Sequence, residues 1–253
     1  MSKYTGTYPS LYRTVDQGQK IGDMANKLAY TGNPKSARWK GGHPTTAYKN
    51  AIVKYHSNHK KSKASIAGAS CDVFVCTSVR ASGVDPNFPQ GLWNQEKYLR
   101  NTSKFKLVTD GSLQDGDIII YKRTGAARKG HICIYYKGKI KEANAKMYYG
   151  RTVDAVKTRL SKDGKQWVRV YRAVNKQVYT PLQKASTGTQ VKNLQKYLNW
   201  YFKDDDDLKA LKVDGDFGSI TTGRVKLFQR QQKLKVDGIV GKLTVAKMKG
   251  VTK

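Results

Sequence analysis

The spacing of apolar residues along the chain predicts a buried helix followed by a group of strands. The segment SCDVFVCTSVRASG (70–83) is apolar around nearly its whole circumference and ends at a glycine, which is typical of a buried helix. Segments 116–122 and 131–145 predict strands, and the second of these divides at the turn Lys137-Gly138. Alternation places His131, Cys133 and Tyr135 on one face of the first strand of that hairpin.

The C-terminal quarter of the chain has helical spacing and an internal repeat. Apolar residues at Val191, Leu194, Leu198 and Tyr201 follow the three-and-four spacing of a helix, and segment 224–234 does the same. The sequence KVDGDFGSIT recurs 23 residues later as KVDGIVGKLT, and each copy contains an Asp-Gly pair that suits a tight turn. We expect Ser219 or Thr221 to cap the helix that follows the first turn.

The segment between these two patterned regions predicts a linker. Residues 174–190 mix Pro, Gly, Ser and Thr after the strand-like QWVRVYR. The sequence therefore predicts an α+β domain over residues 1–178, a linker over 179–189, and a small all-α domain of three helices over 190–253.

The C-terminal segment resembles the small three-helix peptidoglycan-binding domain found on many cell-wall hydrolases. The positions that carry this resemblance cover nearly all of residues 188–247. They are Val191, Leu194, Gln195, Leu198, Asp214, Gly215, Phe217, Gly218, Thr221, Val225, Phe228, Gln229, Leu234, Asp237, Gly238, Gly241 and Thr244. The resemblance implies attachment to the glycan or the stem peptide of a bacterial wall.

Charge and cysteine content narrow the class of protein. The 253 residues include 48 Lys and Arg against 18 Asp and Glu, a net charge of +30 that favours a polyanionic partner. No run approaches the roughly 20 apolar residues that span a bilayer, so we expect no membrane insertion. Three cysteines fit a reducing compartment of synthesis, and no signal peptide is expected at the N-terminus.

Two of the cysteines lie in the predicted helix, at positions that favour different chemical roles. Ser70 is a suitable N-cap, which places Cys71 in the first helical turn, where the free N–H groups favour a thiolate. Cys76 falls in mid-helix among apolar residues and is expected to act as a small core residue. We therefore predict that Cys71 is the nucleophile.

A nucleophilic cysteine needs a base, and the chain offers His43, His56, His59 and His131. The pair His56 and His59 lies in a polar basic stretch, and no Cys or carboxylate cluster accompanies it, so no metal site is expected there. A metal site formed by Cys71, His131 and Cys133 would lack an evident fourth ligand. His131 at the start of a strand is the expected base.

The pattern S-C-D-x-F-V, then G-D-I-I, then G-H-I-x-I-Y resembles the NlpC-type papain-like cysteine hydrolases of cell walls, to which the CHAP amidases are related. The match runs from about residue 66 to residue 145. It implies a helix bearing the cysteine packed on an antiparallel sheet, with Cys71 as nucleophile and His131 as base. It also implies a third polar residue on the next strand, which we assign to Glu142, with Asn144 as the alternative. The chain departs from the usual motif because Ser70 precedes the cysteine and Asp72 follows it.

Together, the two resemblances imply a cysteine-dependent peptidoglycan hydrolase similar to a phage endolysin, without cofactor or metal. It would cleave either the MurNAc–L-alanine amide or a bond of the stem peptide. We expect synthesis in the host cytoplasm, release to the wall through a holin, and retention on teichoic acids through the basic charge. The alternatives are a non-catalytic wall-binding protein and a basic nucleic-acid-binding protein. The second ranks last because no nucleic-acid recognition motif is present.

Overall fold

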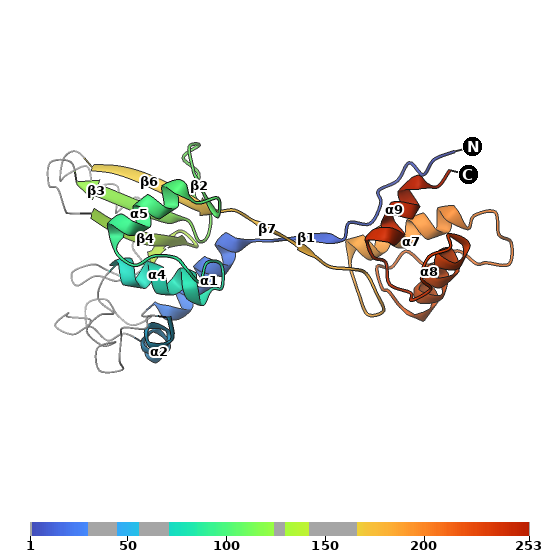
Figure 1. Ribbon diagram of the computed structural model, residues 1–253, viewed down its shortest axis with the longest axis horizontal. Helices are drawn as coiled ribbons and strands as arrows, with labels where there is room; N and C mark the ends of the chain where they lie inside the picture. The colour runs from blue at the N-terminus through green and yellow to red at the C-terminus, as the bar shows by residue number, and fades with distance from the viewer. Residues whose placement is uncertain (1, 30–44, 56–70, 124–129, 142–165, 253) are drawn as a thin grey trace. The chain divides into compact units, whose positions relative to one another are not determined.

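The computed structural model describes residues 2–29, 45–55, 71–123, 130–141 and 166–252, and the structural statements below concern these residues. The chain forms two compact units (Figure 1). One unit is Asp16–Lys176, and the other combines Met1–Val15 with Gln177–Lys253. No helix in the described ranges is long and apolar enough to cross a membrane.

The unit Asp16–Lys176 combines helices with an antiparallel sheet. Its described helices are α1 (Gln17–Leu28), α2 (Thr46–Tyr55), α4 (Cys71–Ala81) and α5 (Leu92–Asn101). Its strands are β2 (Phe105–Leu107), β3 (Ile118–Arg123), β4 (Gly130–Tyr136), β5 (Lys139–Lys141) and β6 (Gln166–Ala173). They pair in the order β2-β6-β3-β4-β5, and each neighbouring pair is antiparallel.

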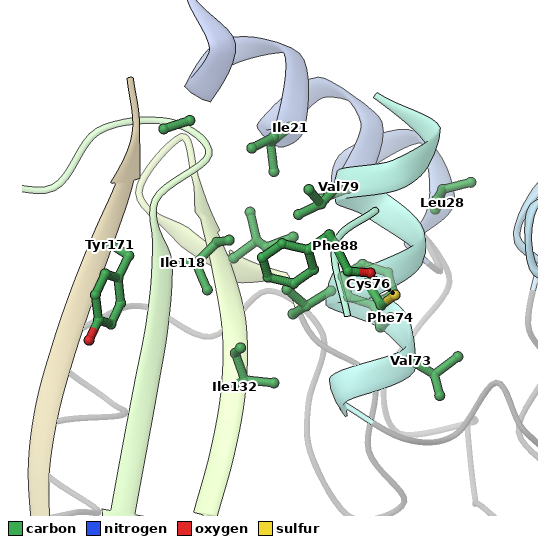
Figure 2. Close-up of a cluster of buried hydrophobic side chains, with 14 of the residues drawn as sticks. Ile21, Leu28, Val73, Phe74, Cys76, Val79, Phe88, Ile118, Ile132 and Tyr171 are labelled. Carbon is green, nitrogen blue, oxygen red and sulfur yellow. Dashed lines mark hydrogen bonds between the residues drawn. The ribbon is translucent and has the colours of Figure 1, made fainter. Parts of the chain in front are cut away.

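Both faces of the central strands are apolar, and each face joins a different cluster. Ile118, Ile120, Ile132 and Ile134 pack with buried residues of α1, α4 and α5 in the main core (Figure 2). Ile119, Tyr121, Cys133 and Ile140 form a smaller cluster. Because neighbouring residues of a strand point to opposite faces, burial on both sides explains the continuous apolar runs of β3 and β4.

Close backbone packing fixes the start of β3 against α1. A Cβ atom built on Gly116 would lie 1.8 Å from the carbonyl oxygen of Gly18, and Gly116 has a φ of 84°. Only glycine fits that approach and that conformation. The next residue, Asp117, is fully buried and accepts two hydrogen bonds from Arg172 of β6, at 2.9 and 2.8 Å.

The second unit contains the C-terminal helices, a two-stranded ribbon and the N-terminal arm. The helices are α7 (Thr189–Tyr201), α8 (Ser219–Gln231) and α9 (Lys242–Gly250), and the ribbon pairs β1 (Tyr12–Val15) with β7 (Lys176–Tyr179). The rings of Tyr4 and Tyr8 contact the ring of Tyr197, and Leu11 is buried in the same core. The first fifteen residues thus belong with the C-terminal unit, which differs from the expected domain 1–178.

The expected linker 179–189 is also a packed part of this unit. Leu182 is buried and exchanges two backbone hydrogen bonds with Val240, at 3.3 and 2.8 Å. Phe217 accepts from the N–H of Ala185 and donates its own N–H to Ser186, both at 3.0 Å. The chain passes between the units at residues 15–16 and again at 176–177, so two connections join them.

Candidate active site and binding module

The helix start predicted to hold the nucleophile is the start of α4. Cys71 is its first residue, is half-buried, and packs against the main core. The next four residues, 72–75, complete the first turn and begin the buried face. Because the first N–H groups of a helix lack partners within it, the start of α4 places backbone donors beside the Cys71 thiol.

Asp72, the residue after the cysteine, connects the first turn of α4 to the helix α5. The Asp72 carboxylate accepts a hydrogen bond from the Gly91 N–H at 3.0 Å, and Gly91 is the N-cap of α5. The buried amide of Gln95 donates to the Asp72 carbonyl at 2.8 Å. Asp72 therefore links the start of α4 to the start of α5, a structural role that the sequence did not reveal.

The other two cysteines are core residues. Cys76 is fully buried, its thiol donates to the Phe88 carbonyl at 3.2 Å, and burial raises its pKa to about 12. This confirms the prediction that Cys76 is a small core residue. Cys133 is also fully buried, and its Sγ lies 3.8 Å from the Ile119 carbonyl oxygen.

His131 lies near the start of β4, on the face that holds Cys133. It is paired with Tyr121 of β3, and the two rings stack with centroids 6.2 Å apart. Tyr121 belongs to the smaller cluster, whereas α4 packs on the opposite face of the sheet. The imidazole is therefore on the face of the sheet away from α4.

The starts of α4 and β4 nevertheless lie at the same end of the main core. Figure 2 shows Val73 and Ile132 together at one end of the cluster, with Val79 and Ile21 toward the other. Cys71 is the first residue of α4 and His131 is the second residue of β4, so the two side chains come from different layers.

Several predicted residues lie outside the described part of the chain. They are Ser70, Glu142, Asn144, His43, His56 and His59. Among the described residues, no group of three His, Cys, Asp or Glu side chains could hold a metal ion. Cys71, His131 and Cys133 are all described, so they do not form the metal site considered as an alternative.

The repeated Asp-Gly turns of the second unit are held by two equivalent glutamines. Gln195 is buried in α7, accepts from the Gly215 N–H at 2.9 Å, and donates to the Asp214 carboxylate at 2.8 Å. In α8, Gln229 does the same for Gly238 at 2.8 Å and for Asp237 at 2.9 Å. Each glutamine thus binds both the backbone and the carboxylate of its turn.

The turns have the predicted conformation, but their polar residues act differently from the expectation. Gly215 and Gly238 have φ values of 88° and 76°. The helix after the first turn begins at Ser219 with Gly218 as its N-cap, and no side chain caps it. The Thr221 hydroxyl instead lies 3.5 Å from the Asp216 carbonyl oxygen, so it supports the turn and does not cap the helix.

Both turn carboxylates are stabilised in their charged form. The Asp216 N–H and then the Gln195 amide lower the pKa of Asp214 below its usual value. The Ile239 N–H, with a further contribution from Gln229, lowers the pKa of Asp237 in the same way. The two repeats therefore share the same turn geometry, the same glutamine contacts and the same charge state.

The comparison with protein families identifies the class of domain to which these helices belong. Residues 187–248 match the family model "Putative peptidoglycan binding domain". The C-terminal unit therefore contains a peptidoglycan-binding domain, as the sequence resemblance predicted. No curated protein matches the chain.

Two solved structures show only distant likeness. A peptidoglycan-binding protein from Clostridioides difficile, in complex with glutamine hydroxamate, is 18% identical. That match covers 46% of this chain and 70% of the other, with a TM-score of 0.24. A periplasmic domain of the EpsAB fusion protein of the Vibrio vulnificus type II secretion system is 15% identical, covers 88% and 84%, and has a TM-score of 0.26. At these scores neither likeness adds to the argument.

Proposed function

We propose that this protein is a peptidoglycan hydrolase that cleaves an amide bond with Cys71 as its nucleophile. One observation supports this most directly: a half-buried free cysteine begins a helix in a chain that also carries a peptidoglycan-binding domain. A cysteine that only filled the core would be enclosed, as Cys76 and Cys133 are. The binding domain would hold this thiol close to its polymeric substrate.

The proposed mechanism has two covalent steps. The Cys71 thiolate attacks the amide carbonyl, and N–H groups at the start of α4 stabilise the oxyanion, each worth about 10²–10³ in rate in other hydrolases. His131 gives a proton to the leaving amine as the C–N bond breaks, which leaves a thioester on sulfur. Water, deprotonated by His131, then releases the acid and restores the thiol. Glu142 or Asn144 would orient the imidazole.

The nucleophile is tested by a matched pair of cysteine variants. We expect Cys71→Ala to abolish the release of peptidoglycan fragments and Cys76→Ala to retain most of it, because Cys76 is enclosed in the core. Mass spectrometry of digested sacculi would identify the new N-termini and so distinguish amidase from endopeptidase cleavage. Fragment release by Cys71→Ala would contradict the assignment. The absence of new ends with the unaltered protein would favour a non-catalytic wall-binding protein.

The base needs a separate test, because His131 and α4 belong to opposite faces of the sheet. If an imidazolium stabilises the Cys71 thiolate, His131→Gln will move the midpoint of Cys71 alkylation by iodoacetamide up by about one pH unit or more. Peptide mass spectrometry follows the reaction at Cys71 alone, and Tyr135→Phe, on the same strand face, is the control. An unchanged midpoint would show that His131 is not the partner of Cys71.

We further propose that the enzyme acts as an endolysin. It would be made in the cytoplasm of a bacterial host and reach the wall after release by a holin. The net charge of +30 supports retention on walls that carry anionic teichoic acids.

A further inference from the structure

Two tyrosines of the ribbon are exposed side by side without contributing to a core. Tyr12 of β1 and Tyr179 of β7 have ring centroids 5.7 Å apart and are 46% and 43% exposed. Leu11 accepts from the N–H of Thr180, and Thr14 accepts from the side chain of Gln177, so Tyr12 and Tyr179 are directly opposite in an antiparallel pair. Neither ring belongs to the core of the unit. Core packing therefore does not account for this pair.

A lysine of the peptidoglycan-binding domain lies over both rings. The Nζ atom of Lys242, the first residue of α9, is 5.1 Å from the Tyr179 ring centroid and 5.9 Å from that of Tyr12. A Cβ atom built on Gly241 would lie 3.4 Å from the Tyr179 hydroxyl oxygen. The aromatic pair is thus continuous with residues 187–248, although both tyrosines lie outside that match.

The same face of the ribbon also presents polar groups. Thr14 and Gln177 are two residues from the tyrosines along their strands, are exposed, and hydrogen-bond to each other at 2.8 Å. Aromatic faces, an ammonium group, an amide and a hydroxyl therefore lie together on one surface.

We propose that Tyr12, Tyr179 and Lys242 form a platform that stacks on the sugar rings of the peptidoglycan glycan strand. A pyranose ring has an apolar C–H face, which fits the face of a tyrosine, and a rim of hydroxyl and N-acetyl oxygens, which can accept from an ammonium or amide. A phosphate polymer would instead favour several cations gathered at one place. The proposal rests on the wall-binding role of the C-terminal unit and names the part of the wall that it recognises.

The test uses the full chain carrying Cys71→Ala, so that bound walls stay intact. We expect Tyr12→Ala with Tyr179→Ala to weaken co-sedimentation with teichoic-acid-free sacculi by about tenfold or more, since both ring contacts with the sugars are lost. Replacing both tyrosines by Phe keeps the ring faces and should leave affinity within about threefold. Leu243→Ala is the matched control, because this 74% exposed apolar side chain follows Lys242 directly.

A soluble probe tests binding to the glycan without the other wall components. Oligomers of N-acetylglucosamine should bind the parent protein in calorimetry and bind the double Ala variant at least about tenfold more weakly. Unchanged thermal unfolding of the variant would show that the loss is local to the surface. Equal binding of parent and double Ala variant to stripped sacculi would overturn the platform while leaving peptidoglycan binding intact. Binding that requires teichoic acid, or failure of the parent to bind sacculi, would also overturn it, and the second result would remove the wall-binding role as well.

Discussion

At the scale of single residues, position in a helix determines what each cysteine can do. Cys71 and Cys76 are five residues apart in one helix, yet Cys71 is half-buried at the helix start and Cys76 is enclosed. A sequence can predict this contrast, because an N-cap signal and helical spacing are local. The link from Asp72 to Gly91 joins residues 19 apart, so no local pattern could predict it.

The turn carboxylates lead to a prediction about acid stability. The pKa values of Asp214 and Asp237 are lowered in the folded unit from a usual value of 3.8. Their contribution to stability is therefore fully present above that value and is lost as the pH falls through the lower folded pKa values. Urea denaturation at several pH values from about 6 to about 2 should show the second unit keeping this stability down to about pH 4 and losing it below.

The corresponding variants provide the control for this prediction. Asp214→Asn with Asp237→Asn should be less stable than the parent near neutral pH and should lose less on acidification. Asp206→Asn changes an exposed carboxylate in the loop between α7 and α8 and should leave the parent's pH profile unaltered. A steep acid loss that persists in the double Asn variant would show that other groups cause it.

At the scale of elements, local signals predicted the hairpin and the buried helix well. The predicted turn joins β4 to β5 with φ values of 46° at Lys137 and 76° at Gly138, and α4 ends two residues before Gly83. The face on which α4 packs could not be predicted, because isoleucines occupy both faces of β3. Alternation grouped His131 with Cys133 correctly, but it gave no information about which layer covers them.

The segment that we expected to be a linker shows why amino-acid composition alone does not locate a domain boundary. Proline, glycine and serine disfavour helices, but they do not prevent a segment from packing. Leu182 is buried in the C-terminal core. The backbone around the glycine and serine residues of this segment forms hydrogen bonds with the first Asp-Gly turn. Leu182 pairs with Val240, and Gly188 with Gly215, both far along the chain, and a composition window does not detect such pairs.

At the scale of the whole molecule, the N-terminal arm belongs to the unit at the other end of the chain. Residues that meet across nearly 250 positions include Lys3 and Thr252, which form a backbone bridge. No periodic pattern links such distant segments, so the sequence could not predict that residues 1–15 pack in the C-terminal unit. The two chain connections between the units follow directly from this arrangement.

This arrangement predicts that deleting residues 2–10 will destabilise the distant C-terminal unit. The deletion removes Tyr4 and Tyr8, whose rings contact Tyr197 and each other, and exposes the core around Leu11. With about 1 kcal/mol lost for each aromatic contact, the thermal midpoint of that unit should fall by about 10 °C or more. Calorimetry of the full chain should resolve this shift, while the transition of residues 16–176 stays in place.

A matched variant distinguishes packing from chain length in this last experiment. Thr5→Ala with Thr7→Ala alters two exposed arm residues beside the tyrosines and should leave both transitions unchanged. Tyr4→Ala with Tyr8→Ala should reproduce most of the effect of the deletion, because their rings supply the aromatic contacts with α7. The rest would come from the backbone N–H of Ser10, which donates to the Gln190 side chain of α7 at 2.6 Å. If the deletion instead lowers the transition of residues 16–176, the arm stabilises the other unit, and the division of the chain at residue 15 is wrong.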